Sequence, residues 1–318
     1  MLQRRGRWTP DSMNLFKQLA HTAIRKLTAS APWGVRQAML EGYLDHPYDI
    51  PRANQRVLRM LNITEIGADG SCGVITGDPN DRFVLLSYAA AGAGAAPPVV
   101  LKELLDFFGT EPGTYMDVGA NIGLTTIPIA RNHRIRCLAF EPEPVNFGHL
   151  KRNVARNAEG ASVEFYPVAL FDKHGTMPMS IAETNTGDHR LTSGAVSDRR
   201  MIDVQVAPLD DFIDRIEGRL ALKVDTQGAE PFVVAGGQGV FARAGLISME
   251  FCPYLMRQLG GDPGIVMDLV AGFDRVAILE TWTPQYCSPS EARKMLENKL
   301  RTAADTDEDY LDILAVRS

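Results

Sequence analysis

Residues 115–123 read Tyr115-Met116-Asp117-Val118-Gly119-Ala120-Asn121-Ile122-Gly123, so an acidic residue closes an apolar run and two glycines follow it, four positions apart. An apolar run that ends in a glycine-rich turn and leads into a helix is typical of the first strand-turn-helix unit of a doubly wound sheet. In such folds this turn lies at the carboxyl edge of the sheet and holds a nucleotide-like cofactor. The stretch therefore predicts both an architecture and the position of a ligand.

From residue 114 onward, short apolar runs alternate with amphipathic segments. This alternation predicts a parallel sheet with crossover helices. We expect strands at residues 114–118, 135–141, 162–168, 219–225, 245–251, 275–281 and 310–316. We expect helices at residues 99–108, 123–131, 144–157, 208–217 and 229–243, and one that begins at Ser288. Two further alternating runs, 177–181 and 202–206, predict an inserted β-hairpin. The expected fold is α/β: a doubly wound, seven-stranded, mostly parallel sheet of Rossmann-like type.

The helix that begins at Ser288 carries its own start signal. Ser288 suits the N-cap, Pro289 the first helical position, and Glu291 the third position of a capping box. Helical spacing from this start predicts a buried stripe formed by Ala292, Met295, Leu296 and Leu300.

Residues 1–98 predict a small N-terminal cap region. We expect helices at 11–30 and 32–44, followed by short glycine-punctuated β runs, of which residues 83–86 form one. Residues 89–98 are Ala, Gly and Pro only, which indicates a flexible connection. The main domain is therefore predicted over residues 99–318.

Charge is unevenly placed along the chain. Residues 1–36 carry seven Lys or Arg against Asp11 alone, a net charge of +6, in a chain whose total is −6. The acidic remainder disfavours nucleic acid as a partner of the main body. The basic first helix is expected to dock on the protein. The alternatives are contact with an anionic membrane surface or a partner, a homodimer contact, and an Arg-rich organellar transit peptide.

The cysteines and the apolar runs bear on the compartment. Four cysteines lie far apart without a CxxC pair, which argues against a zinc site or a disulfide framework and suits a reducing compartment. The longest apolar stretches run to about eight residues, far fewer than a bilayer-spanning helix needs. We therefore expect a cytoplasmic protein.

An acidic residue also ends the second predicted strand. Glu141 follows Gly123 by eighteen positions, where an acid at a strand tip can accept hydrogen bonds from both hydroxyls of a ribose. Nicotinamide cofactors use an acid at the same place, so the first turn must distinguish between the two kinds of cofactor. Its glycines are not spaced as GxGxxG, and a carboxylate beside the turn suits an amine or a sulfonium better than a pyrophosphate. This favours S-adenosylmethionine, with Asp117 and Asn121 at its amino acid end and Gly119 and Gly123 allowing close approach.

A third block, Leu222-Lys223-Val224-Asp225-Thr226-Gln227-Gly228-Ala229-Glu230, ends the strand expected next to the first one. A lysine in an apolar strand is costly to bury unless it is paired, and Asp225 is the obvious partner because it lies two positions on, on the same face. A structural ion pair and a catalytic role are equally compatible with this pattern. Glu230 either anchors the turn or meets the substrate.

The three blocks, DVGANIG, FEPEP with Asn153 and Asn157 after it, and KVDTQGAE, resemble the FkbM-type family of class I S-adenosylmethionine-dependent methyltransferases. The resemblance covers roughly residues 113–255. It implies a seven-stranded fold with an antiparallel last strand, and O-methylation of a hydroxyl on a sugar or other natural product. The family's cofactor positions fall on Asp117, Gly119, Asn121, Gly123 and Glu141. The acceptor implied is a small molecule or a glycan, of unspecified identity.

Methylation of an alcohol requires that the hydroxyl lose its proton, so a general base is expected. His189 is the first choice because imidazole titrates near neutrality, and Asp188, Asp225 and Glu250 compete for the role. Carboxylates could instead hold a metal, but their spacing is too generic to predict one. Two other functions stay open: a non-catalytic binding or scaffold subunit with the same fold, and a nicotinamide-dependent oxidoreductase.

Overall fold

The computed structural model describes residues 64–81, 83–91, 98–194, 199–279, 284–307 and 309–317. The helices expected at 11–30 and 32–44, with the basic first segment, lie outside the described residues. No helix within the described ranges is both long and apolar enough to cross a membrane.

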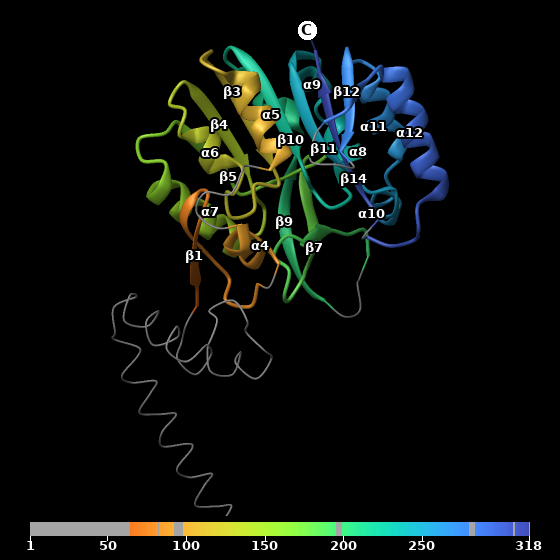
Figure 1. The fold of residues 1–318 in the computed structure, drawn as a ribbon. Helices are drawn as coiled ribbons and strands as arrows, with labels where there is room; N and C mark the ends of the chain where they lie inside the picture. Colours follow the sequence, from red (N-terminus) through yellow and green to blue (C-terminus); the bar gives the residue numbers. More distant parts are fainter. Residues whose placement is uncertain are drawn as a thin grey trace, which may run out of the picture.

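The main sheet has eight strands in the order β13-β12-β14-β11-β10-β3-β4-β5. Figure 1 shows it running from β5 and β4 on one side to β14 and β12 on the other. Neighbours from β11 to β5 pair in parallel, whereas β14 is antiparallel to both β11 and β12. The strands are β3 (Gly113–Val118), β4 (Ile135–Phe140), β5 (Val163–Tyr166), β10 (Arg219–Val224), β11 (Leu246–Phe251), β12 (Arg275–Leu279), β13 (Tyr286–Cys287) and β14 (Leu311–Val316). The predicted fold class is confirmed, and the one addition is the two-residue edge strand β13.

Strand order reverses between β3 and β10, because the chain runs outward through β4 and β5 and then returns to the other side of β3. In a doubly wound sheet, this reversal opens a crevice at the carboxyl ends of the two central strands. The first and third sequence blocks therefore end side by side, with Asp117 paired to Lys223 in the β3–β10 register.

Each face of the sheet is covered by helices, so β3 is buried along its whole length. Tyr115 belongs to the core on one face and Met116 to the core on the other, as the alternation of side chains along a strand requires. The first core includes residues of α5 (Val99–Phe108), α6 (Thr126–Ala130) and α7 (Pro144–Asn157). The second includes residues of α8 (Glu230–Ala235), α9 (Gln238–Arg243), α10 (Pro253–Leu259), α11 (Pro263–Val270) and α12 (Pro289–Thr302).

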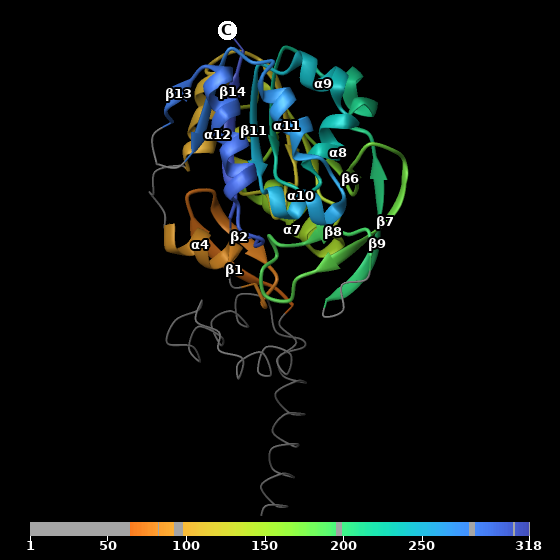
Figure 2. The same cartoon turned by 90° about the vertical axis from the view of Figure 1, so that its right-hand side faces the viewer.

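The inserted hairpin is confirmed and is larger than expected. Its long strands pair antiparallel within a second sheet of order β6-β9-β7-β8, formed by β6 (Ala169–Leu170), β7 (Gly175–Ile181), β8 (Arg190–Leu191) and β9 (Arg200–Ala207). Figure 2 shows β7 and β9 as a layer beside the main sheet. This sheet has a small core of its own, to which Phe171 and Leu259 contribute. The insertion is thus a packed element that can form a wall.

The described part of the cap is a hairpin of β1 (Ile66–Gly70) and β2 (Gly73–Gly77), followed by α4 (Val84–Ala91). The strand predicted at 83–86 is wrong, because this segment is helical. Asp81 starts the helix: its carboxylate accepts hydrogen bonds from the backbone N–H groups of Phe83, Val84 and Leu85. Thr76 of β2 donates its N–H to Asn153 Oδ1 of α7 at 2.8 Å, so the cap packs directly on the main domain. The division at residue 98 stays a prediction.

Three helix predictions need correction in detail. The helix expected over 229–243 is two helices, α8 and α9, broken at Gly236, where a Cβ would lie 2.1 Å from the Phe171 carbonyl oxygen. The segment expected at 208–217 is a 3-10 helix, η1 (Leu209–Arg215). The capping box of Ser288 and Glu291 is present in α12, but Met295 is 42% exposed and does not belong to its buried stripe.

Candidate active site

A crevice of about 260 Å³ opens at the carboxyl ends of β3, β4 and β10. Its walls come from the turn after β3, the tip of β4, the first turn of α7 and the turn after β10. The inserted sheet and α4 complete it, through residues such as Met179, Leu191 and Val84. The three sequence blocks thus meet at one site, as the switch in strand order requires.

The turn after β3 is packed backbone to backbone against the turn after β10. Gly119 has a φ of +81°, and a Cβ there would lie 1.9 Å from the Asp225 carbonyl oxygen. Any side chain at 119 would therefore separate the two turns. Asn121 has a φ of 51°, a left-handed conformation that few residues other than Gly adopt and that asparagine tolerates best. Gly119 and Asn121 both line the crevice, whereas Gly123 is not among its lining residues.

Asp117 supports this turn from below. It is fully buried, it does not line the crevice, and its Oδ2 accepts hydrogen bonds from the hydroxyls of Thr125 at 2.7 Å and Thr126 at 2.6 Å. The sequence pattern placed Asp117 at the amino acid end of the cofactor. In the structure its contacts hold the chain that follows the turn, so it acts on the crevice through that chain.

Glu141 lines the crevice and is 5% exposed. Its Oε2 accepts a hydrogen bond from the N–H of Asn121 at 2.8 Å, and its Oε1 accepts one from the N–H of Glu143 at 2.9 Å. Burial raises the pKa of Glu141 to about 8, although both backbone hydrogen bonds act to lower it. A carboxylate oxygen has more than one lone pair, so each can still accept a hydroxyl.

Two amide side chains, those of Asn121 and Asn146, bind the loop between β7 and β8 of the inserted sheet to the turn after β3 and to the start of α7. The carbonyl oxygen of Thr186, between β7 and β8, accepts from Asn121 Nδ2 at 2.7 Å and from Asn146 Nδ2 at 3.1 Å. The hydroxyl of Thr186 donates to Asp81 Oδ2 at 2.9 Å, so the cap holds the same loop. The sequence pattern did not single out Asn146 or Thr186. No local signal marks a loop carbonyl that is bound by residues 40 and 65 positions away.

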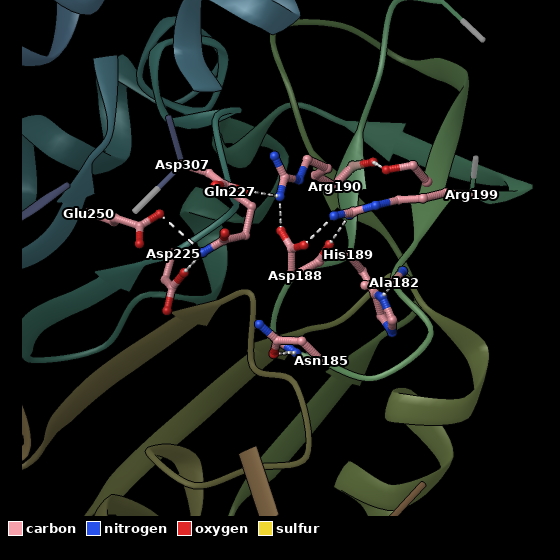
Figure 3. A network of polar contacts seen from close by, with 12 residues as sticks. Ala182, Asn185, Asp188, His189, Arg190, Arg199, Asp225, Gln227, Glu250 and Asp307 are labelled. Carbon is pink, nitrogen blue, oxygen red and sulfur yellow. Dashed lines mark hydrogen bonds and ion pairs between the residues drawn. The ribbon is translucent and has the colours of Figure 1, made fainter. Parts of the chain in front are cut away.

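The turn after β10 brings charged groups together. Lys223 Nζ lies 3.0 Å from Asp225 Oδ2, which confirms the expected ion pair. Gln227, with a left-handed φ of 56°, donates from Nε2 to Asp225 Oδ1 at 3.0 Å and to Glu250 Oε2 at 3.1 Å (Figure 3). Glu230 is fully buried and accepts from Thr226 and from the N–H of Gly228, so it anchors the turn.

The carboxyl groups near this turn differ in pKa because their charged neighbours differ. Burial alone would raise the pKa of Asp225, but Lys223 and the Gln227 amide outweigh it, so that the pKa is lowered and the group is ionised. Burial, together with the nearby Asp225 charge, raises the pKa of Glu250 well above its ordinary value. The same two causes raise the pKa of Asp312, the β14 partner of Glu250, to about 6. Among these groups Asp225 lines the crevice, whereas Glu250 and Asp312 are not among its lining residues.

His189 also lines the crevice, but its ring is turned toward Ala182 (Figure 3). Nδ1 accepts the Ala182 N–H at 3.1 Å, which assigns the proton of the neutral ring to Nε2. Burial lowers the pKa of His189 to about 4. The ring is therefore a neutral donor in this arrangement. Its neighbour Asp188 is bound by the guanidinium groups of Arg190 and Arg199.

Comparison with known proteins relates the chain to methyltransferases. Residues 117–273 match the Methyltransferase FkbM domain family. Methyltransferase sdnD of Sordaria araneosa is 30% identical over a stretch that covers 38% of this chain and 59% of that protein. A magnesium protoporphyrin IX methyltransferase from Synechocystis solved with bound SAM is 11% identical, with a TM-score of 0.35 over 69% of this chain and 76% of that one. TYW2 from M. jannaschii in complex with AdoMet is 12% identical, with a TM-score of 0.33 over 80% and 87%.

The two structural likenesses are too low to support a conclusion, so the fold rests on the strand order itself. That order, with its antiparallel strand β14 between β11 and β12 and its crevice at the switch point, defines a class I methyltransferase fold. Residues 117–273, the part of the chain that matches the FkbM methyltransferase domain family, contain all three sequence blocks that meet at this crevice.

Proposed function

We propose that this protein is an S-adenosylmethionine-dependent O-methyltransferase that acts on a hydroxyl group of a small molecule or glycan. The observation that carries the proposal is the meeting of the glycine turn, Glu141 and the Lys223–Asp225 turn in one crevice. The family match and the methyltransferase relative support the transfer of a methyl group.

The crevice residues suit the adenosine half of the cofactor. Glu141 keeps lone pairs free for ribose hydroxyls while backbone N–H groups hold its carboxylate in place. Three apolar side chains that also line the crevice, Phe140, Val168 and Leu170, suit a flat aromatic base. The bound cofactor supplies an activated methyl group, so the task of these residues is to bind it and to orient it toward the acceptor.

The charges of the crevice favour an uncharged reacting group on the acceptor. Its ionisable lining residues within the described chain are Glu141, His189, Lys223 and Asp225. The ammonium of Lys223 is already paired with Asp225, and Glu250 and Asp312 lie behind that pair. Among these residues a phosphate or carboxylate acceptor would therefore meet no unpaired positive charge, and the ionised Asp225 would repel it, although the raised pKa values of Glu141 and Glu250 disfavour further negative charge. A neutral hydroxyl avoids this repulsion and can donate to Asp225.

Asp225 is the group best placed to receive the acceptor proton. Its side chain is 40% exposed, it opens on the crevice, and Lys223 and Gln227 fix both of its oxygens. A carboxylate with a low pKa is a weak base, but a hydroxyl becomes strongly acidic as its oxygen bonds to the methyl carbon. Proton transfer to Asp225 late in the reaction is therefore favourable. His189, a donor through Nε2, would orient the acceptor and would not deprotonate it.

Isotope-labelled S-adenosylmethionine offered with a native metabolite extract tests the proposal. We expect mass spectrometry to find label on an oxygen atom of a small molecule or glycan, and Asp225→Asn to slow formation of the product by about 100-fold while S-adenosylhomocysteine still binds. Label on nitrogen or carbon would reject O-methylation. Cofactor binding without any transfer would favour the scaffold alternative, and absence of cofactor binding would reject the proposal altogether.

A further inference from the structure

Asn146, in the first turn of α7, carries a polar atom with no partner. The residue is 1% exposed and lines the crevice. Its Oδ1 is buried and receives no hydrogen bond in the described structure. A buried acceptor left without a donor is unfavourable and is rare in folded proteins, which points to a missing donor. The crevice that Asn146 lines is the place from which a ligand can supply it.

The amide of Asn146 is fixed in its orientation. Nδ2 donates to the carbonyl oxygen of Thr186 at 3.1 Å, so rotation of the amide by half a turn would set two oxygens against each other. The backbone N–H of Asn146 donates to Glu143 Oε2 at 2.7 Å, which caps the helix and holds the residue at its start. Oδ1 is therefore held in place before any ligand binds.

The surroundings of Asn146 indicate which part of the cofactor it meets. Asn121 donates to the same Thr186 oxygen, and the N–H of Asn121 donates to Glu141. One chain of hydrogen bonds therefore links Asn146 to Glu141, the acid that suits the ribose, through Thr186 and Asn121. The adenosine half of the cofactor carries three donor groups: two ribose hydroxyls and the amino group of adenine.

We propose that Asn146 binds the adenosine half of S-adenosylmethionine by accepting one of these hydrogen bonds at Oδ1, while Nδ2 holds the Thr186 loop against the crevice. The inference rests on the proposed use of this cofactor and adds a residue to its site. It also links the cofactor to the inserted sheet, because one side chain contacts both. Bound cofactor would then hold in place the loop that carries His189.

The test is a cycle of binding measurements that needs no acceptor. Calorimetry compares S-adenosylhomocysteine with its 2′-deoxy, 3′-deoxy and 6-deamino analogues, on wild type and on Asn146→Leu. For the analogue that lacks the donor bound by Asn146, wild type should lose about 5- to 100-fold in affinity. Asn146→Leu should lose less than about 2-fold for the same analogue, because its partner is already absent.

Controls separate this contact from a change of shape. Asn146→Leu also loses the bond to Thr186, but that loss is common to all four ligands and cancels in the cycle. Asn298→Leu makes the same chemical change at an exposed position of α12 and should leave every affinity unchanged. If Asn146→Leu does not fold, Asn146→Ala removes the same atoms. Additive losses for all three analogues would overturn the inference, whereas failure of wild type to bind S-adenosylhomocysteine would overturn the proposed function instead.

Discussion

Replacement of Glu141 by Gln should change stability and cofactor binding in opposite directions. The pKa of Glu141 is about 8 in the folded protein, raised by burial from an ordinary value of 4.5. A carboxyl group whose pKa is raised by folding stabilises the protein while it is protonated, below its unfolded pKa. That contribution is lost as the pH rises toward the folded pKa.

The magnitude follows from the two pKa values. With about 1.4 kcal/mol for each pKa unit, ionisation of Glu141 should lower the free energy of unfolding by about 2.5 kcal/mol between pH 5.5 and pH 7.5. Glu141→Gln cannot ionise, so its free energy of unfolding should fall by that much less over the same interval. Denaturant unfolding without cofactor, at four or five pH values, measures the difference. Glu159→Gln, at an exposed position, is the matched control and should behave as wild type.

Cofactor binding should show the opposite effect. Ribose hydroxyls bind best to the ionised carboxylate, so the affinity of wild type for S-adenosylhomocysteine should increase with pH up to about 8. The Gln side chain offers one neutral amide oxygen in place of the two charged oxygens of the carboxylate. Glu141→Gln should therefore bind about 10- to 100-fold more weakly at pH 8, with little dependence on pH, from the usual value of a charge-assisted hydrogen bond. Parallel pH profiles of stability for the two proteins, or equal affinities, would refute this reasoning.

Three further variants test other parts of the site. Asp225→Asn should lower turnover by about 100-fold and His189→Asn by less than about tenfold, because only Asp225 is placed to take the proton. Both variants should keep the cofactor affinity of wild type. The reverse order in steady-state kinetics would return the role of general base to His189. Glu250→Gln should reduce the loss of stability as the pH rises above the ordinary carboxyl pKa, because the raised pKa of Glu250 makes its ionisation in the folded protein costly. A steeper loss in a pH series of melting curves would contradict this. Gly119→Ala should lower the melting temperature and weaken S-adenosylhomocysteine binding, because its Cβ would meet the Asp225 oxygen at 1.9 Å; wild-type values in thermal shift and calorimetry would show that the two turns can separate freely.

Local patterns were sufficient for most of the main domain. The bounds of α7 match the sequence expectation at both ends, because Pro144 sets its start and apolar periodicity its length. Failures occurred where a side-chain cap or a distant contact overrides the pattern of apolar residues. Residues 83–86 read as a strand, yet the carboxylate of Asp81 caps them into a helix. Gly236 divides a helix because the Phe171 carbonyl packs against it.

The sequence by itself determined the chemistry that borders the crevice. Gly119, Glu141 and the Lys223–Asp225 pair could be predicted because each follows directly from a strand end, and parallel strands end at one edge. Tertiary structure alone decided how these groups are oriented and which of them are accessible. It buried Asp117 beneath the turn, directed Nδ1 of His189 to a backbone N–H, and left Oδ1 of Asn146 without a donor. The physical reason is that a strand-end motif fixes where a side chain begins, whereas its hydrogen-bond partners belong to other turns and strands, from seven positions away for His189 to 40 for Asn146.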